Sequence, residues 1–350
     1  MKKVSLKYIA DQLKVSTAVV SVVLNNGAGN IRVSAEVRKK IIDLAKELNY
    51  RPNSLARGLK TGKTNTIGLL VSDISNHYYS KVARSVEDVA NSYGYNVIFC
   101  SSDDSVEKES NLVHLFRERK VDGIILSGTQ QNPELIRLLE DEGYPLVLID
   151  RDYKESKVPF VGLGKKNQEA AYQAVRHLIE NGFKKIFLIT VYPHLEPMHL
   201  REKGYMEALQ NSGIQLDPNF VLEIGCGDLY QSIRSGIEKH FSSGFSFDAI
   251  FTLNNKLALH ALQVLHDLGK VIPDDLGFVC FDDHEIFGFS NPKITAISHF
   301  PAEVGQKAVE LLIQEMKQLS GVKKSESVSV QLIVRESTTQ TQSTNQLNTK

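Results

Sequence analysis

From residue 66 to residue 281, short apolar runs of strand length alternate with longer stretches of helical period. The runs 67–71, 123–126 and 146–149 are apolar at nearly every position, which is typical of strands buried on both faces. Apolar strands separated by helices form a parallel sheet with helices on both sides. Two such series follow one another, so we predict a body of two α/β lobes with a cleft between them.

The first series predicts strands at 67–71, 96–100, 123–126 and 146–149, with helices at 79–93, 106–119 and 133–142. The second predicts strands at 160–162, 186–190, 221–224, 249–252 and 277–281, with helices at 168–181, 201–212, 229–241 and 256–268. Ligands of open α/β sheets bind beyond the carboxyl ends of the strands. We therefore expect a binding site in the loops that follow the strands, such as SDISNHYY (72–79), Asp150-Arg151 and Asn254-Asn255.

Ahead of this body, residues 5–25 read SLKYIADQLKVSTAVVSVVLN. Their apolar spacing indicates a helix up to Leu13, a turn at Lys14-Val15 and a second helix that Ser16 can cap. Two short helices with a small residue, Ala10, at their crossing describe a helix-turn-helix, whose second helix enters the DNA major groove. An ordinary helical hairpin in a protein core leaves the same pattern, so this hypothesis needs support from the rest of the chain.

The charge distribution supplies that support. The 41 basic and 41 acidic residues balance overall, but residues 1–64 hold 13 Lys and Arg against 4 Asp and Glu. Residues 65–350 therefore hold 28 basic and 37 acidic residues. A basic head on an acidic body is typical of a nucleic-acid-binding module joined to a domain that does not bind nucleic acid.

A third helix is expected from Ser34, which is a good N-cap, to Leu48. It ends there because Pro52 follows closely, and the residue before a proline avoids the helical conformation. Its apolar face would close a three-helix core. The segment NSLARGLKTGKT (53–64) could form one further short helix. Such a helix is too short to be stable alone in water, which suits a linker that folds on binding.

Several other protein classes lack support in the sequence. The apolar runs are too short to span a bilayer, and the N-terminus has no apolar signal region, so we expect a cytoplasmic protein. The cysteines Cys100, Cys226 and Cys280 are widely separated, which argues against a metal site or a disulfide. No GxSxG, P-loop or GxGxxG motif indicates an enzyme or a cofactor.

The polar tail, residues 338–350, is predicted to be disordered.

A series of motifs follows in order along the chain: LKYIA, VVSVVLN, VRKKI, LNYRPNSLARGLKTGKT, SDISNHYY, VDGIIL, REKGY, DAIFTLNN and FDD, within a resemblance that covers residues 4 to about 337. Together they resemble the LacI/GalR family of bacterial transcription regulators. The resemblance implies a small all-α helix-turn-helix head and a two-lobed α/β body of the periplasmic-binding-protein type I fold, with parallel sheets. It also implies a homodimer or higher oligomer that binds pseudo-palindromic double-stranded operator DNA.

The resemblance also implies domain boundaries. We assign residues 1–50 to the DNA-binding head, 51–65 to a hinge helix and linker, and 66–337 to the effector-binding and dimerisation body. The chain would cross between the lobes three times. Lobe 1 would comprise about 66–163 and 295–322, and lobe 2 about 164–294 and 323–337.

Residues that contact DNA are carried over by position. The base-facing positions of the second helix are Thr17, Ala18, Ser21 and Val22. In the hinge, Leu59 matches a leucine that wedges into the minor groove beside Ala56 and kinks the duplex, the alternative being helix packing. The candidates for backbone contacts are Lys7, Ser16, Asn25, Tyr50, Asn53 and Arg57.

Two positions of the second helix depart from the family's pattern. The family commonly has Thr where Val19 stands and very often has Arg where Val22 stands. Arginine is the usual bidentate reader of guanine, which contributes about 1–3 kcal/mol of discrimination. The operator is therefore expected to differ from the family's usual half-site at that base pair.

The effector-binding residues carried over from the family are Tyr78, Tyr79, Arg201, Asn254 and Asp282. Aromatic faces with Asp, Asn and Arg suit a small polyol or sugar. Each residue has an alternative role: the tyrosines in the core, Arg201 paired with a structural acid, and Asp282 capping a turn. Asn255 stands where the family usually has Asp.

The loss of that carboxylate, together with the cations Arg201, Lys203, Lys165 and His77, favours a sugar acid or sugar phosphate as one hypothesis for the effector. We predict a DNA-binding repressor switched by a small metabolite. The alternative is a sugar-binding receptor of a transport or chemosensory system, which would share the fold of the body.

Overall fold

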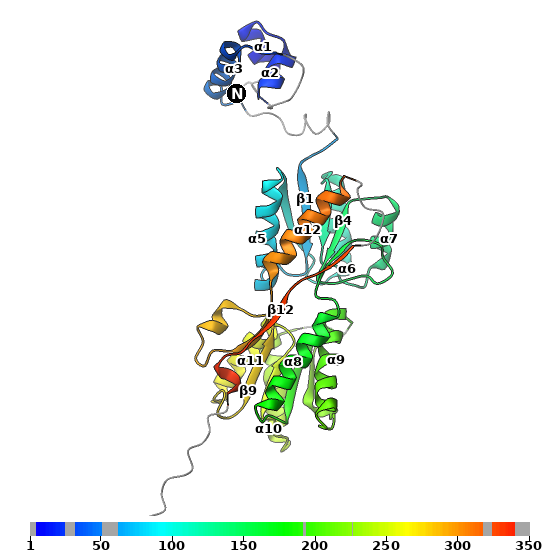
Figure 1. The fold of residues 1–350 in the computed structure, drawn as a ribbon, viewed down its shortest axis with the longest axis vertical. Coiled ribbons are helices and arrows are strands. Elements are labelled where there is room, and N and C mark those ends of the chain that lie inside the picture. The colour runs from blue at the N-terminus through cyan, green and yellow to red at the C-terminus, as the bar shows by residue number, and fades with distance from the viewer. Residues whose placement is uncertain are drawn as a thin grey trace, which may run out of the picture. The chain divides into compact units, whose positions relative to one another are not determined.

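The computed structural model describes residues 5–24, 32–50, 62–191, 194–225, 227–317 and 324–339. These residues form two compact units, Met1–Thr64 and Asn65–Lys350, which we call the head and the body. Figure 1 shows the helices of the head and the two stacked lobes of the body. The predicted hinge residues Ala56 and Leu59, like the backbone candidates Asn25, Asn53 and Arg57, lie outside the described residues.

The head contains three helices, α1 (Leu6–Leu13), α2 (Thr17–Leu24) and α3 (Ala35–Glu47). Serine hydroxyls accept backbone N–H bonds at the start of each helix: Ser5 from Tyr8 at 3.2 Å, Ser16 from Val19 at 3.3 Å and Ser34 from Val37 at 3.3 Å. Lys14 adopts a left-handed conformation, φ 53°, and ends α1. The helices pack around a small core of Ile9, Ala10, Val20, Val23, Ile41 and Ala45.

Lobe 1 is a six-stranded parallel sheet in the order β11-β5-β4-β3-β1-β2. Helices α5 and α12 cover one face of this sheet, and α6 and α7 cover the other. The strands are β1 (Thr66–Val71), β2 (Asn96–Ser101), β3 (Gly123–Leu126), β4 (Leu146–Ile149), β5 (Phe160–Gly162) and β11 (Ser325–Ser327). The helices are α5 (His77–Ser92), α6 (Val106–Glu118), α7 (Pro133–Asp141) and α12 (Pro301–Glu315).

Lobe 2 is a second six-stranded sheet in the order β12-β10-β9-β8-β6-β7, in which β12 is antiparallel to β10. Helices α8 and α9 pack on one face, and α10 and α11 on the other. The strands are β6 (Ile186–Val191), β7 (Val221–Ile224), β8 (Ala249–Thr252), β9 (Gly277–Phe281), β10 (Thr295–His299) and β12 (Val330–Ile333). The helices are α8 (Lys166–Glu180), α9 (Glu196–Asn211), α10 (Leu229–Ser242) and α11 (Asn255–Asp267).

The strands and helices predicted between residues 67 and 281 are present, most of them within two residues of the expected ends. Helix α9 differs most, because it begins at Glu196 rather than at residue 201. Pro197 fits the first turn of a helix, where its missing N–H has no intrahelical partner to lose. The prediction began too late because it started the helix at the REKGY motif.

The chain passes between the sheets three times, after β5, after β10 and after β11. Two segments were predicted in the wrong lobe. Residues 295–299 form β10, which pairs with β9 in lobe 2, and residues 325–327 form β11, which pairs with β5 in lobe 1. Both strands are short, and the lobe to which each belongs depends on hydrogen bonds to strands far away in the sequence.

The prediction of a disordered tail from residue 338 was wrong at its start. A short 3-10 helix, η3 (Glu336–Thr338), contains Ser337 and Thr338, which are fully buried. The Thr338 hydroxyl shares hydrogen bonds with the Thr295 hydroxyl at 3.1 Å and with His177 Nε2 at 2.8 Å. Next to it, the Ser337 hydroxyl donates to the Phe278 carbonyl at 2.6 Å. These bonds satisfy the polar groups of the segment inside lobe 2, which its polar composition alone does not reveal.

No helix in the described ranges combines the length and the apolar character that crossing a membrane requires. The described part of the chain also contains no cluster of three or more His, Cys, Asp or Glu side chains placed to hold a metal ion.

Candidate effector and DNA-binding sites

A cavity of about 310 Å³ lies between the two lobes of the body. The residues that line it come from the loops at the carboxyl ends of the strands, as expected for open α/β sheets. The structure brings together at this cavity all five predicted effector residues: Tyr78, Tyr79, Arg201, Asn254 and Asp282.

Arg201 and Asp282 form the lobe 2 wall of the cavity. The Arg201 guanidinium lies 3.6 Å from the centre of the Phe281 ring, and its Nη1 donates to the Leu253 carbonyl at 2.6 Å. It pairs with Asp282 at 3.4 Å, although only 2 % of Arg201 is exposed. Arg201 thus has the structural ion pair considered as its alternative role, while its side chain still borders the cavity.

Asp282 remains ionised inside this wall. Burial alone would raise the pKa of its carboxyl group, but Arg201 and His299 outweigh that effect and lower the pKa below its usual value. The His299 Nε2 atom lies 2.7 Å from Asp282 Oδ1. The charged carboxylate is therefore available as an acceptor for a ligand hydroxyl or amine.

The tyrosines connect the cavity to the protein interior. The Tyr79 hydroxyl donates to Asp150 at 2.7 Å and shares a 3.0 Å hydrogen bond with Ser127. The Tyr78 ring lies 4.4 Å from the ring of His299 in the other lobe. Both tyrosines are largely buried, so packing accounts for much of their role. Asn254 similarly caps α11, since its side-chain oxygen accepts from the Leu257 N–H at 2.8 Å.

The sequence prediction missed several residues that line the cavity. Asp104 follows β2 as Asp73 follows β1, so the rule that ligands bind at the carboxyl ends of strands could have found it. Arg151 follows the fourth predicted strand, but it is not among the five residues carried over from the family. His299 ends β10, a strand that the pattern did not reveal.

The charges of the cavity differ from the expectation for an acidic ligand. Of the cations that favoured one, Arg201 borders the cavity, whereas the Lys203 side chain is exposed, and neither Lys203 nor Lys165 is among the residues that line it. His77 instead stacks on His284 at a centroid distance of 4.1 Å. Five aspartates do line the cavity: Asp73, Asp103, Asp104, Asp150 and Asp282.

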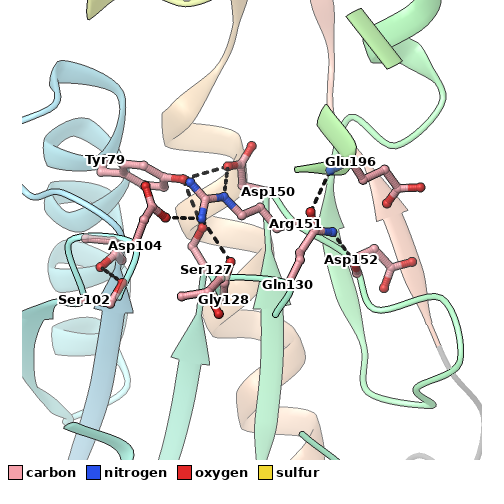
Figure 2. A network of polar contacts seen from close by, with 12 residues as sticks. Tyr79, Ser102, Asp104, Ser127, Gly128, Gln130, Asp150, Arg151, Asp152 and Glu196 are labelled. Carbon is pink, nitrogen blue, oxygen red and sulfur yellow. Dashed lines mark hydrogen bonds and ion pairs between the residues drawn. The ribbon is translucent and has the colours of Figure 1, made fainter. Parts of the chain in front are cut away.

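Direct bonds join the two lobes on either side of the cavity. Lys256 pairs with Asp73 at 3.2 Å, and the Asn255 amide donates to Asn76 at 3.3 Å. Elsewhere, the Glu196 N–H donates to the Gln130 side-chain oxygen at 2.7 Å (Figure 2). Contacts between protein groups therefore stabilise this arrangement of the lobes.

We expect acidification to destabilise the body. Burial lowers the pKa of His177, His260 and His284, whereas an unfolded histidine has a pKa of about 6.5. Below that pH the unfolded state binds more protons than the folded state, and stability is lost. Calorimetry should give a lower Tm at pH of about 6 than at pH of about 7.5, with a smaller difference for His284→Asn. A higher Tm at the lower pH would contradict this assignment.

The head presents a candidate DNA-binding surface on α2. Thr17 and Ala18 are exposed, and Ser21 and Val22 are half-buried. Val19, one of the two departures from the family pattern in this helix, packs against the core of the head. Of the predicted backbone contacts, Lys7 and Ser16 are exposed and Tyr50 is half-buried.

A capped helix-turn-helix joined to a two-lobed body with an internal cavity defines the class of ligand-responsive DNA-binding proteins. Two family models match: "Bacterial regulatory proteins, lacI family" over residues 5–53 and "Periplasmic binding protein-like domain" over residues 175–338. The chain is 33 % identical over 338 residues to the HTH-type transcriptional regulator RegA of Clostridium saccharobutylicum, covering 95 % of this chain and 99 % of the relative. The chain belongs to the lacI family of bacterial transcriptional regulators.

Other relatives and solved structures agree with this placement. Catabolite control protein A of Priestia megaterium is 32 % identical over 89 % of this chain and 92 % of its own length. The lac repressor dimer bound to operator and the anti-inducer ONPF has the same fold, with a TM-score of 0.83 at 23 % identity over 96 % of this chain and 99 % of that chain. A LacI family regulator from Enterococcus faecium with bound ribose has a TM-score of 0.68 at 26 % identity, over 78 % of this chain and 98 % of that chain.

Proposed function

We propose that this regulator is a repressor that binds a pseudo-palindromic operator as a homodimer and is switched by a sugar or sugar derivative in the interlobe cavity. The observation that carries the proposal is the meeting of Tyr78, Tyr79, Arg201 and Asp282 at one cavity, in a chain whose head matches the lacI family. The protein would act on DNA in the cytoplasm, without catalysing a reaction.

The switch would be a two-state equilibrium. An effector that binds one arrangement of the lobes more tightly shifts the population toward it. In a dimer, a change between the lobes would alter the separation of the two chains entering their heads, and so the affinity for two half-sites. Binding of effector and binding of operator would then be coupled reciprocally.

In the head we propose that Thr17, Ala18, Ser21 and Val22 face the bases, and that Lys7, Ser16, Asn25, Tyr50, Asn53 and Arg57 contact the backbone. Ala56 and Leu59 would act in the minor groove. The half-exposed side chain of Val22 supports its place on the reading surface. Because valine cannot donate a hydrogen bond, it would read by apolar contact with a thymine methyl group.

Selection from a random pool of duplex DNA tests the DNA-binding part of the proposal. The full chain should enrich an inverted repeat, and fluorescence anisotropy should show binding at least about 1,000-fold tighter than to scrambled DNA, with affinity falling steeply with salt. Enrichment of a single half-site without symmetry would contradict binding as a dimer. No enrichment at all would contradict the function itself.

The dimer is supported by exposed apolar side chains in both lobes. Ile98 and Phe99 are more than one third exposed on β2, an edge strand of the lobe 1 sheet. In lobe 2, Ile286 is 51 % exposed and Phe289 is 88 % exposed. Side chains of this size gain free energy when an interface removes them from water, so they are candidates for the dimer contact.

Phe289→Asp is accordingly expected to convert the dimer to a monomer at micromolar concentration, because it would place a carboxylate in an apolar contact. Leu138→Asp is the matched control, since Leu138 is 42 % exposed on α7, on the sheet face opposite α5. Light scattering should report a monomer for the first variant and an unchanged dimer for the second. If both variants remained dimers, Phe289 would not be part of the dimer interface.

A further inference from the structure

Arg151 is the most enclosed cation on the lobe 1 side of the cavity. It follows β4 and is 6 % exposed. Its Nη1 atom lies 2.5 Å from Asp104 Oδ1 and donates to the Gly128 carbonyl at 3.1 Å, while its Nε lies 3.8 Å from Asp150 Oδ2 (Figure 2). One guanidinium is therefore flanked by two carboxylates, which leaves this wall with an excess of negative charge.

The loop after β2 aims Asp104 at this guanidinium. Asp103 and Asp104 both have left-handed backbones, φ 52° and 55°, a conformation that Asp and Asn tolerate better than most residues. As a result, the neighbouring carboxylates have different partners. Asp104 pairs with Arg151, whereas Asp103 pairs with Lys108 on α6.

The other cations of the cavity are also paired. Arg201 lies beside Asp282, and Lys256 lies beside Asp73. A carboxylate or phosphate on a ligand would have to displace one of these acids or lie close to it. Like charges repel at such short range, whereas hydroxyl and ammonium groups can donate to the carboxylates.

We propose that Asp104 is a specificity-determining residue, which occupies Arg151 and so restricts the cavity to uncharged or amine-bearing hydroxylated ligands. This inference rests on the proposed effector function of the cavity. It replaces the sugar acid or sugar phosphate of the sequence-based hypothesis with a chemically opposite class. It also predicts that removing one carboxylate would admit an anion.

The test uses the full chain and a panel of monosaccharides and disaccharides, each with its uronate, phosphate and amino counterparts. In thermal-shift measurements, the wild type should be stabilised by neutral or amino members and not by the anionic ones. Asp104→Asn keeps a residue that tolerates the left-handed backbone but releases Arg151. Its affinity for the anionic counterpart of the same sugar should be at least about tenfold higher than that of the wild type. Titration calorimetry measures both affinities.

Asp103→Asn is the matched control. It removes the same charge from the same loop but leaves Arg151 paired with Asp104, so its gain in affinity for the anion should be several times smaller than that of Asp104→Asn. An equal gain in both variants would show a general charge effect and overturn the role of Asp104. Preference of the wild type for an anionic sugar would overturn the ligand class, even if Asp104→Asn failed to fold.

If no member of the panel stabilised the protein, that result would count against this ligand class. Selection of an operator would still support the function as a regulator. Failure of the operator selection, by contrast, would remove the proposed function on which the inference rests. The two failures are thus separated by whether DNA binding is retained.

Discussion

Arg201→Ala is expected to lower the free energy of unfolding of the body by about 3–5 kcal/mol, because it leaves the Asp282 carboxylate charged, buried and without its arginine partner. The variant also loses the hydrogen bonds from the guanidinium to Asn167 and to the Leu253 carbonyl. Urea unfolding followed by circular dichroism measures the loss. The stabilisation by any effector that the wild type binds should disappear as well.

Arg176→Ala supplies the control for this prediction. Arg176 forms an ion pair of similar chemistry with Glu180, but both side chains are more than half exposed. Exposed pairs contribute about 0–1 kcal/mol. If the two arginine variants lost the same stability, the buried pair would have no special role in the fold of lobe 2.

Val20→Asp is expected to abolish specific DNA binding while leaving the body folded. Val20 is fully buried in the core of the head, which consists of six buried residues. An unpaired carboxylate there costs several kcal/mol, more than a domain of about 50 residues can lose and stay folded. Since the body is a separate compact unit, its unfolding transition should remain.

Fluorescence anisotropy should show operator affinity falling more than about 100-fold, toward the level of nonspecific DNA. Ala35→Asp is the control, because it adds the same charge at an exposed position in the first turn of α3, where an acid favours the helix. Its affinity should fall only severalfold. A similar loss in both variants would show that charge, rather than folding of the head, explains the effect.

The predictable part of the fold consists of elements whose pattern is local. The strands at 67–71, 123–126 and 146–149 were recognisable because both faces of each strand are buried, which requires apolar residues throughout. The helices of the head were recognisable because Ser16 and Ser34 stand where caps are needed. The rule on the carboxyl ends of strands indicated the loops that contain Tyr78, Tyr79 and Asn254, and the family resemblance added Arg201 and Asp282.

The misassigned segments are those whose placement depends on distant partners. Residues 295–299 and 325–327 are short strands, and nothing in their composition shows which sheet accepts them. Ser337 and Thr338 look like part of a polar tail, but their hydroxyls are satisfied by groups of lobe 2. Each of these outcomes is set by hydrogen bonds between residues more than 40 positions apart or between separate strands.

The amino-acid pattern was sufficient for the class of the protein, a basic helix-turn-helix head ahead of two α/β lobes, because periodicity, capping and charge act within a few residues of one another. Only the tertiary structure decided the electrostatics of the cavity. Arg151 and Asp104 stand 47 residues apart, and Arg201 and Asp282 stand 81 apart. Counting cations along the chain therefore favoured an anionic ligand. In the fold, Arg201 is paired with Asp282, Lys203 and Lys165 do not line the cavity, and His77 stacks on His284, which supports the proposed preference for ligands without negative charge.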